Sequence, residues 1–277
     1  MSTSGGSASP LGPLSVGNVV SAGVRIYRSH LQRYFMLALL AYVWLFVPIY
    51  GWAKYSAING QLSRLAFQEL INQPESNEES RSFTNPRMWS FLAAGLLMGL
   101  IFFGVAIALA IVIGIVAAVG AGLAVGAPAL GLLGGLLIFA VSVAAIVFVI
   151  WLYARLLIVE VPLAIEPSLD AASTIGRSWN LTKGSVGRIM GVVFVAFLIT
   201  LLVNVPVQVA SFALDAASQA SPESPVVALL SLALFVVSVL SGALLLPFWQ
   251  VIKAVIYYDL RSRREGLGLE LRSDRKR

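Results

Sequence analysis

The longest pattern in the chain is an apolar stretch over 88–154, in which no residue is charged. Water would not stabilise so long an apolar segment, and a transmembrane helix needs about 20 apolar residues. Gly120 and Pro128 interrupt the middle of the stretch, so it predicts two spans, over 89–119 and 130–159. We therefore expect an integral membrane protein.

Three further apolar stretches are long enough to cross a bilayer, over 34–53, 189–214 and 226–254. The predicted fold class is all-α, a polytopic membrane helix bundle with about five transmembrane helices. Pro48 leaves a second interpretation open, because a proline can break a helix. In it the first stretch enters the membrane and returns, which gives six membrane segments. We favour a crossing, because a returning limb would carry Lys54 into the membrane.

Amphipathic patterns flank these spans. Apolar residues recur at helical spacing over 15–33, 54–72 and 160–187, while charged side chains keep to the other faces. We expect the first and third of these segments to be interfacial amphipathic helices, and the second to extend the first span out of the bilayer. The polar segment 73–87 is expected to be a mobile loop.

The composition leaves room for one membrane domain and little else. Of the 277 residues, 58% are hydrophobic and 12% are charged. Ser, Gly and Pro dominate residues 1–13, which we expect to be a disordered N-terminal tail and not a signal peptide. Residues 14–260 are predicted to form a single integral membrane domain, followed by a basic C-terminal tail over 261–277.

The net charge of +6 is concentrated beside the predicted spans. This distribution favours anionic lipid headgroups as partners and gives no support for nucleic acid. With five spans, every Lys and Arg except Arg25, Arg28 and Arg33 falls on one side of the membrane. Because basic loops remain in the cytoplasm, we expect a cytoplasmic C-terminus. A re-entrant first segment would bring the three remaining arginines to the same side.

Small residues recur every four positions in the first half of the central stretch. This ridge consists of Ala106, Ala110, Gly114, Ala118 and Gly122. In lipid, a ridge of small side chains lets two helix backbones approach closely and pack. We expect it to pack against another helix of the same chain; a homodimer seam and a permeation groove are the alternatives.

Charged residues near the predicted membrane edge form a second candidate feature. The predicted polar cluster consists of Arg155, Glu160, Lys253, Asp259, Arg261 and Arg264. We expect ion pairs to join the third and fifth spans there, with Glu160 bound to Lys253 or Arg261. A network that fixes helix register is the favoured interpretation, and a gate for a substrate or a proton is the alternative.

Asn204 and Gln208 form an amide pair inside a predicted span, one helical turn apart and on either side of Pro206. We expect them to make interhelical hydrogen bonds, which would satisfy the carbonyls that the proline leaves free. A solute site is the alternative.

The sequence offers no catalytic constellation. It contains no cysteine and a single histidine, His30, so thiolate chemistry is excluded and a transition-metal site lacks ligands. A metal-dependent phosphodiesterase would need several His and carboxylate ligands around a phosphate. We therefore expect no enzymatic activity, no metal and no cofactor.

Two segments resemble a known family. They are LIVEVPLAIEPSLDAASTIGRSWNLTKGSVGRIMG over 157–191 and YYDLRSRREGLGLEL over 257–271. Both resemble the membrane domain of the glycerophosphoryl diester phosphodiesterase membrane-domain family. The resemblance implies a multi-pass bacterial membrane module, commonly with six spans. The soluble catalytic domain that some relatives carry is expected to be absent.

Together these patterns predict a non-enzymatic, membrane-embedded scaffold or accessory module in the bacterial inner (plasma) membrane. Its expected partners are membrane lipids, including anionic ones, and a protein partner or a second copy of the chain. A transporter or channel for a small solute is the alternative. Transporters place polar groups and broken helices at the membrane midplane, and such groups are sparse here.

Overall fold

A computed structural model describes residues 15–221 and 224–266, which contain helices and no strand. The elements are α1 (Val16–Ser29), α2 (Leu31–Trp44), α3 (Tyr50–Leu70), α4 (Asn77–Thr84), the 3-10 helix η1 (Asn85–Arg87), α5 (Met88–Gly126), α6 (Pro128–Leu156), α7 (Glu160–Ile165), α8 (Ser173–Thr182), α9 (Val186–Ala220) and α10 (Pro225–Arg264). The all-α fold class predicted from the sequence is confirmed.

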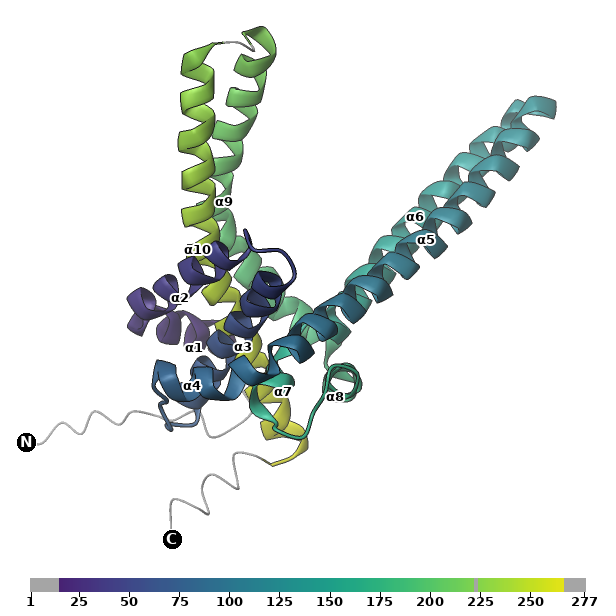
Figure 1. Ribbon diagram of the computed structural model, residues 1–277. Helices are drawn as coiled ribbons and strands as arrows, with labels where there is room; N and C mark the ends of the chain where they lie inside the picture. The colour runs from purple at the N-terminus through teal and green to yellow at the C-terminus, as the bar shows by residue number, and fades with distance from the viewer. Residues whose placement is uncertain (1–14, 222–223, 267–277) are drawn as a thin grey trace, which may run out of the picture.

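The helices form a base and two long hairpins, which diverge from one another (Figure 1). One hairpin is α5 with α6 and the other is α9 with α10. The base consists of α1 to α4, α7 and α8, together with the lower parts of the hairpin helices. Helix α10 runs through the base and contacts α1, α2, α3, α7 and α8.

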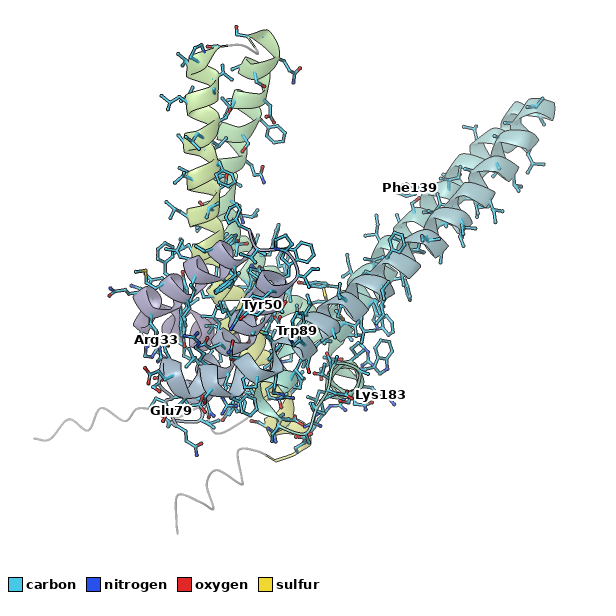
Figure 2. The ribbon with its side chains drawn as sticks, in the orientation of Figure 1. Arg33, Tyr50, Glu79, Trp89, Phe139 and Lys183 are labelled. Carbon is cyan, nitrogen blue, oxygen red and sulfur yellow. The ribbon has the colours of Figure 1, made fainter. Side chains whose placement is uncertain are left out.

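Within the described residues, the four hairpin helices are long and apolar enough to cross a membrane. They contain 39, 29, 35 and 40 residues. At 1.5 Å per residue each is about 43 Å long or longer, which exceeds the roughly 30 Å of the hydrocarbon core. Figure 2 shows apolar Phe139 on a hairpin, whereas the charged Arg33, Glu79 and Lys183 lie in the base. These features are those of an integral membrane protein.

The first predicted span, 34–53, is not a single helix. The backbone reverses at Ile49, whose φ of 60° is left-handed, directly after Pro48. The rings of Trp44 and Tyr50 then pack against each other across the turn, 5.7 Å between centroids. Helix α2 has 14 residues and therefore extends about 21 Å, which is too short to cross the bilayer.

The expected crossing by this segment is therefore wrong, and the re-entrant alternative describes its geometry. Helices α2 and α3 form a short hairpin, and Tyr42 packs against Tyr55 with 6.3 Å between ring centroids. At its turn Phe46 is 75% exposed and Ile49 is 62% exposed, an arrangement that suits contact with lipid. A Cβ at Gly51 would collide with the carbonyl oxygen of Trp44, so the tight reversal requires glycine.

The segment 73–87, expected to be a loop, contains α4 and η1. Helix α4 begins with a capping box, in which the Ser76 hydroxyl accepts from the backbone N–H of Glu79 (3.1 Å) and the Glu79 carboxylate accepts from the N–H of Ser76 (2.7 Å). Such a box satisfies two backbone donors that would otherwise lack partners. An ion pair of 2.6 Å between Arg64 and Glu75 fixes the approach to α4 against α3.

The segment 160–187 forms α7 and α8, which pack into the base. Val161 and Leu163 of α7 and Leu181 of α8 are fully buried or nearly so. Before α8, the Asp170 carboxylate accepts from the backbone N–H of Ser173, the first residue of that helix, at 2.7 Å. Its bonds with Ser173 hold the pKa of the Asp170 carboxyl below its usual value. This segment therefore contributes buried side chains to the core of the base, in addition to exposed side chains on its surface.

The structure differs from the predicted domain boundaries at the C-terminal end of the membrane domain. Helix α10 continues past residue 260 to Arg264, so the first residues of the predicted tail 261–277 belong to a helix. The predicted N-terminal tail over 1–13 and residues 267–277 lie outside the described residues.

The buried core lies in the base. Its largest buried side chains come from different helices and include Tyr34, Leu62, Leu181, Ile252 and Tyr257. A second cluster at the foot of α5 and α6 contains Phe91, Leu152 and Leu163. Most large apolar side chains on the upper hairpins are exposed, as is expected of helices surrounded by lipid.

Candidate functional site

Glu160 and Lys253 form an ion pair between two helices of the base. Glu160 is the first residue of α7, and Lys253 lies on α10. The Lys253 Nζ donates to Glu160 Oε1 at 2.5 Å. The Glu160 side chain is 28% exposed and the Lys253 side chain is 19% exposed, so the pair is half-buried and open on one side. Lys253 is one of the two partners expected for Glu160 from the sequence.

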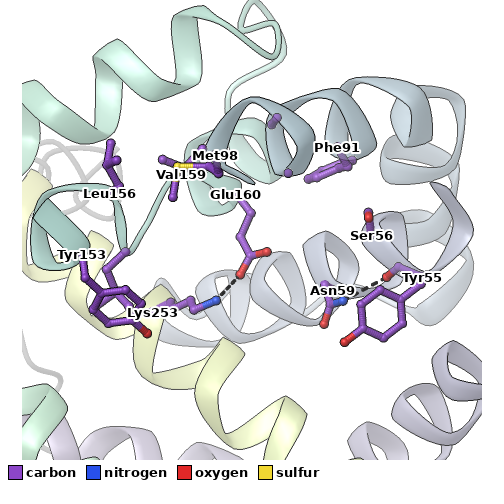
Figure 3. A pocket seen from close by; sticks show the side chains of 13 residues that line it. Tyr55, Ser56, Asn59, Phe91, Met98, Tyr153, Leu156, Val159, Glu160 and Lys253 are labelled. Atoms are coloured by element: carbon purple, nitrogen blue, oxygen red, sulfur yellow. Dashed lines mark hydrogen bonds and ion pairs between the residues drawn. The ribbon is translucent and has the colours of Figure 1, made fainter. Parts of the chain in front are cut away.

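The pair lies in a cavity of 260 Å³ at the point where the two hairpins diverge, which we call the fork pocket. Its walls come from α3, α5, the end of α6, the start of α7 and α10. The side chains used below are Tyr55, Asn59, Phe91, Met98, Tyr153, Glu160 and Lys253. Figure 3 shows Glu160 and Lys253 pointing toward each other between the two tyrosines. Burial raises the pKa of the Tyr55 phenol above its ordinary value of 10.0, and a neutral phenol can both donate and accept a hydrogen bond.

The fork pocket therefore combines a carboxylate, an ammonium and two phenols with apolar walls. Phe91 and Met98 of α5 supply part of the apolar surface. Such a cavity suits a ligand that has a charged or polar group attached to apolar chains.

Arg177 links a second group of charges at the end of the base. It donates to Glu166 at 2.9 Å and lies 2.5 Å from Glu265. Tyr257 donates to the same Glu166 oxygen at 2.5 Å, and Arg261 donates to Glu265 at 2.8 Å. The hydrogen bond from Arg177 holds the pKa of the Glu265 carboxyl below its ordinary value of 4.5.

The remaining members of the predicted polar cluster lie elsewhere. Asp259 is buried between Arg188, at 3.1 Å, and Arg263, at 3.2 Å. Arg264 donates to the carbonyl oxygens of Asn180, at 2.8 Å, and Lys183. The six residues expected to form one cluster are therefore divided among separate groups, because α10 places successive turns against different neighbours.

Arg155 belongs to none of these ion-pair groups. It lies in the last turn of α6 and is 4% exposed. Its guanidinium lies over the ring of Trp179, 4.1 Å from the centroid, and 5.8 Å from that of Trp151. The expected link from Arg155 to the fifth span is absent among the residues that the structure describes.

A buried polar chain between α3 and α10 was not predicted. The Ser63 hydroxyl donates to Gln250 Oε1 at 2.9 Å, and Gln250 Nε2 donates to Asn59 Oδ1 at 3.0 Å. Asn59 in turn donates to the carbonyl of Tyr55 at 3.1 Å. The signal available in the sequence is Gln250 itself, an amide within the apolar run of the last span, which would be costly to leave unpaired.

Arg87 is a second residue that sequence reasoning missed. It donates to the carbonyl oxygens of Leu163 (2.6 Å), Glu166 (3.2 Å) and Leu169. Through these bonds it fastens the start of α5 to the chain after α7, and so it fixes one wall of the fork pocket.

Asn204 and Gln208 do not form the expected interhelical bonds. Gln208 is exposed and Asn204 is half-buried on α9, and neither side chain takes part in a hydrogen bond within the part of the chain that the structure describes. Helix α9 continues through Pro206 without interruption. The prediction that the two amides join helices of this chain is therefore wrong.

The small-residue ridge also faces away from the neighbouring helix. Ala106, Ala110, Gly114, Ala118 and Gly122 are all exposed. A Cβ built on Gly114 or Gly122 would meet nothing within 4 Å. The prediction that this ridge packs against another helix of the same chain is therefore wrong.

A different set of small residues forms the contact between α5 and α6. A Cβ on Gly134 would lie 2.9 Å from the Cα of Gly120, and one on Gly131 would lie 2.9 Å from the Cβ of Ala124. Positions repeated every four residues drift by about 40° per step around an α-helix, so they cannot all face one straight neighbour. A long antiparallel contact requires spacings that alternate between three and four.

The described residues contain no group of three or more His, Cys, Asp or Glu side chains that could hold a metal ion. The ion pairs among these residues join side chains of different helices, as Glu160 and Lys253 do, or neighbouring turns of one helix, as Arg261 and Glu265 do.

The comparisons with known proteins give one match. A family model described as a domain of unknown function, DUF7847, matches residues 86–260. No curated protein and no solved structure matches the chain. The matched range contains α5 to α9, α10 as far as residue 260, and the ion pair of Glu160 with Lys253. Helices α1 to α4 lie before it. The chain therefore belongs to the DUF7847 family.

Proposed function

We propose that the protein is a non-enzymatic, membrane-embedded scaffold or accessory module that holds lipid between its two hairpins. The observation that carries this proposal is the fork pocket, in which the Glu160–Lys253 pair is set among apolar side chains where the hairpins diverge. A phospholipid has the same two chemistries, a charged headgroup and apolar chains. The hairpins, with their exposed apolar faces, supply the surface along which such chains lie.

The two opposite charges favour a headgroup that carries both signs. The Lys253 ammonium would bind the phosphate, and the Glu160 carboxylate would bind an ammonium such as that of a phosphoethanolamine headgroup. Removing one partner from a buried ion pair leaves a charge uncompensated, which is costly. A zwitterionic headgroup avoids this cost because it supplies a counter-charge to each member when the pair opens.

For the protein we propose the bacterial inner (plasma) membrane, with the base and the C-terminus in the cytoplasm. No Lys or Arg occurs over 88–154 or over 189–252, so the upper parts of both hairpins are free of positive charge. Basic residues collect on the cytoplasmic side of membrane proteins. The resemblance to the glycerophosphoryl diester phosphodiesterase membrane-domain family supports a bacterial module of this kind.

A proton-coupled transporter is the second candidate, and Glu160 is the observation that favours it. An ionisable side chain in a cavity near the membrane is a common element of proton pathways. The hairpins diverge instead of enclosing a common channel (Figure 1), which argues for the lipid-holding module.

The proposal is tested by the phospholipids that the full-length protein retains. We expect protein purified in mild detergent to carry phosphoethanolamine lipid, measured by mass spectrometry. The double variant Glu160→Gln, Lys253→Gln should lose it, since the variant removes both charges without leaving one unpaired. Arg28→Gln on α1, an exposed residue far along the chain from the fork pocket, is the matched control and should retain the lipid.

Equal lipid retention by the parent and the double variant would refute the lipid-holding role. Reconstituted vesicles separate the two candidates. A pH-dependent flux that Glu160→Gln abolishes, in a variant that melts like the parent, would favour the transporter.

A further inference from the structure

Arg155 is a buried cation without a counter-charge in the described structure. The residue is 4% exposed, and its Nε is buried and has no hydrogen-bond partner. None of the ion pairs formed within residues 15–221 and 224–266 includes it. Leaving a cation buried and unpaired is costly, so the site is expected to receive an anion.

The surroundings hold the guanidinium in one place. The backbone carbonyl of Arg155 accepts from the hydroxyls of Ser178 (2.9 Å) and Thr182 (3.1 Å), which fastens the end of α6 to α8. The Arg155 Cζ lies over the Trp179 ring, 4.1 Å from its centroid, and Trp151 packs edge-on against Trp179 with 5.4 Å between ring centroids. The ring beneath it favours the cation, while the Nε of the guanidinium is left without a hydrogen-bond partner.

A second guanidinium adds to the positive charge here. Arg264 is exposed and donates to the carbonyls of Asn180 and Lys183, at the end of α8. Arg264 is therefore fastened to α8, the same helix whose hydroxyls hold the backbone carbonyl of Arg155. Neither arginine is paired with a carboxylate in the described part of the chain, so the local charge is about +2.

We infer that Arg155 and Arg264 bind the phosphate of an anionic phospholipid headgroup. Arginine matches phosphate geometry with two parallel hydrogen bonds. Trp151 is 38% exposed and Trp179 is 37% exposed, and tryptophan is enriched at the depth of lipid headgroups. Two positive charges without a carboxylate favour a lipid of net negative charge, unlike the fork pocket, whose charges have both signs. The site stands independently of the function proposed for the fork pocket.

Titration of the full-length protein with phosphatidylglycerol in detergent tests this inference. Tryptophan fluorescence is a direct reporter, because two indoles line the site, and thermal unfolding is the second readout. We expect Arg155→Gln to weaken binding about tenfold, as for the loss of a charge-assisted contact. Arg264→Gln should weaken it too, and this exposed residue can be replaced if Arg155→Gln fails to fold. The control is Arg28→Gln, which removes one exposed charge and should bind like the parent.

Binding by both Arg155→Gln and Arg264→Gln at parental affinity would overturn the inference, and so would an equal loss in Arg28→Gln. Phosphatidylcholine that binds as tightly as phosphatidylglycerol would overturn the preference for anionic lipid. Inorganic phosphate that produces the same fluorescence change at the same concentration would show that the ligand is a soluble phosphate and would overturn the lipid assignment.

Discussion

The ion pair of Glu160 and Lys253 connects α7 to α10 across the fork pocket. The pair stabilises the protein because each charge is the counter-charge of the other, and water reaches only part of both side chains. A single substitution therefore removes more than the pair contributes, because it leaves the second charge without a partner.

At this residue scale we predict that Glu160→Gln alone destabilises the protein by about 1–3 kcal/mol. The second substitution Lys253→Gln should restore part of the loss. Thermal unfolding in detergent of the two single variants and the double variant, analysed as a double-mutant cycle, measures the coupling. A double variant whose loss equals the sum of the two single losses would show that the pair has no coupling energy.

A pH prediction follows from Glu265. The hydrogen bond from Arg177 holds the pKa of the folded Glu265 carboxyl below its ordinary value of 4.5. A carboxyl with a lowered folded pKa contributes stability that is present above the unfolded pKa and is lost as the pH falls through the folded pKa. We expect the melting temperature to fall below pH 4.5, and Glu265→Gln should flatten that fall. An identical acid dependence in both proteins would contradict this role.

At the scale of elements, the α5/α6 hairpin depends on the close contact of Gly120 with Gly134. Each glycine leaves room for the other backbone, and a side chain on either would force the helices apart. The exposed ridge at Gly114 has no such neighbour in the chain.

We therefore predict that Gly134→Leu lowers the thermal stability in detergent, by about 1–3 kcal/mol as for overpacking in general. Gly114→Leu is the matched control on α5 and should melt like the parent, because its side chain would point into lipid. A loss of stability in Gly114→Leu that depends on protein concentration would show instead that the ridge packs against a second copy of the chain.

At the scale of the whole molecule, charge and apolar surface are separated. The base contains the ion pairs and the buried core, and the hairpins expose apolar side chains (Figure 2). Because α2 and α3 fold back at Ile49, α1 lies in the base beside α9 and α10. We therefore predict that the arginines of α1 and the basic end of α10 face the same side of the membrane.

The absence of native cysteine makes this topology testable. Single cysteines at Ser21 and Asn180, both exposed in the base, should react with an impermeant thiol reagent from one side of the membrane. Cysteines at Val125 and Ser221, at the far ends of the two hairpins, should react from the other side. Labelling of Ser21 from the side opposite to Asn180 would restore the five-span arrangement and contradict the re-entrant hairpin.

The sequence by itself determined the all-α class and the two central spans. The uncharged stretch over 88–154 can be stable only as helices in lipid. Within it, one helix ends at Gly126 and the next begins at Pro128, with Ala127 between them. It also limited the partners of Glu160 to a few basic residues on the last helix, because a charge near the membrane needs a counter-charge.

Only the tertiary structure decided which faces meet. Helices that are apolar all round have no polar side to mark their orientation, and lipid is as apolar as a neighbouring helix. The ridge at Gly114 therefore turned outward while Gly120 met Gly134. Long charged side chains can each reach several partners, so the sequence could not separate Glu160 with Lys253 from the groups around Arg177 and Asp259. Which helix faces meet and which charged side chains pair depend on how the helices of the base pack. That packing is decided by contacts between residues far apart in the chain.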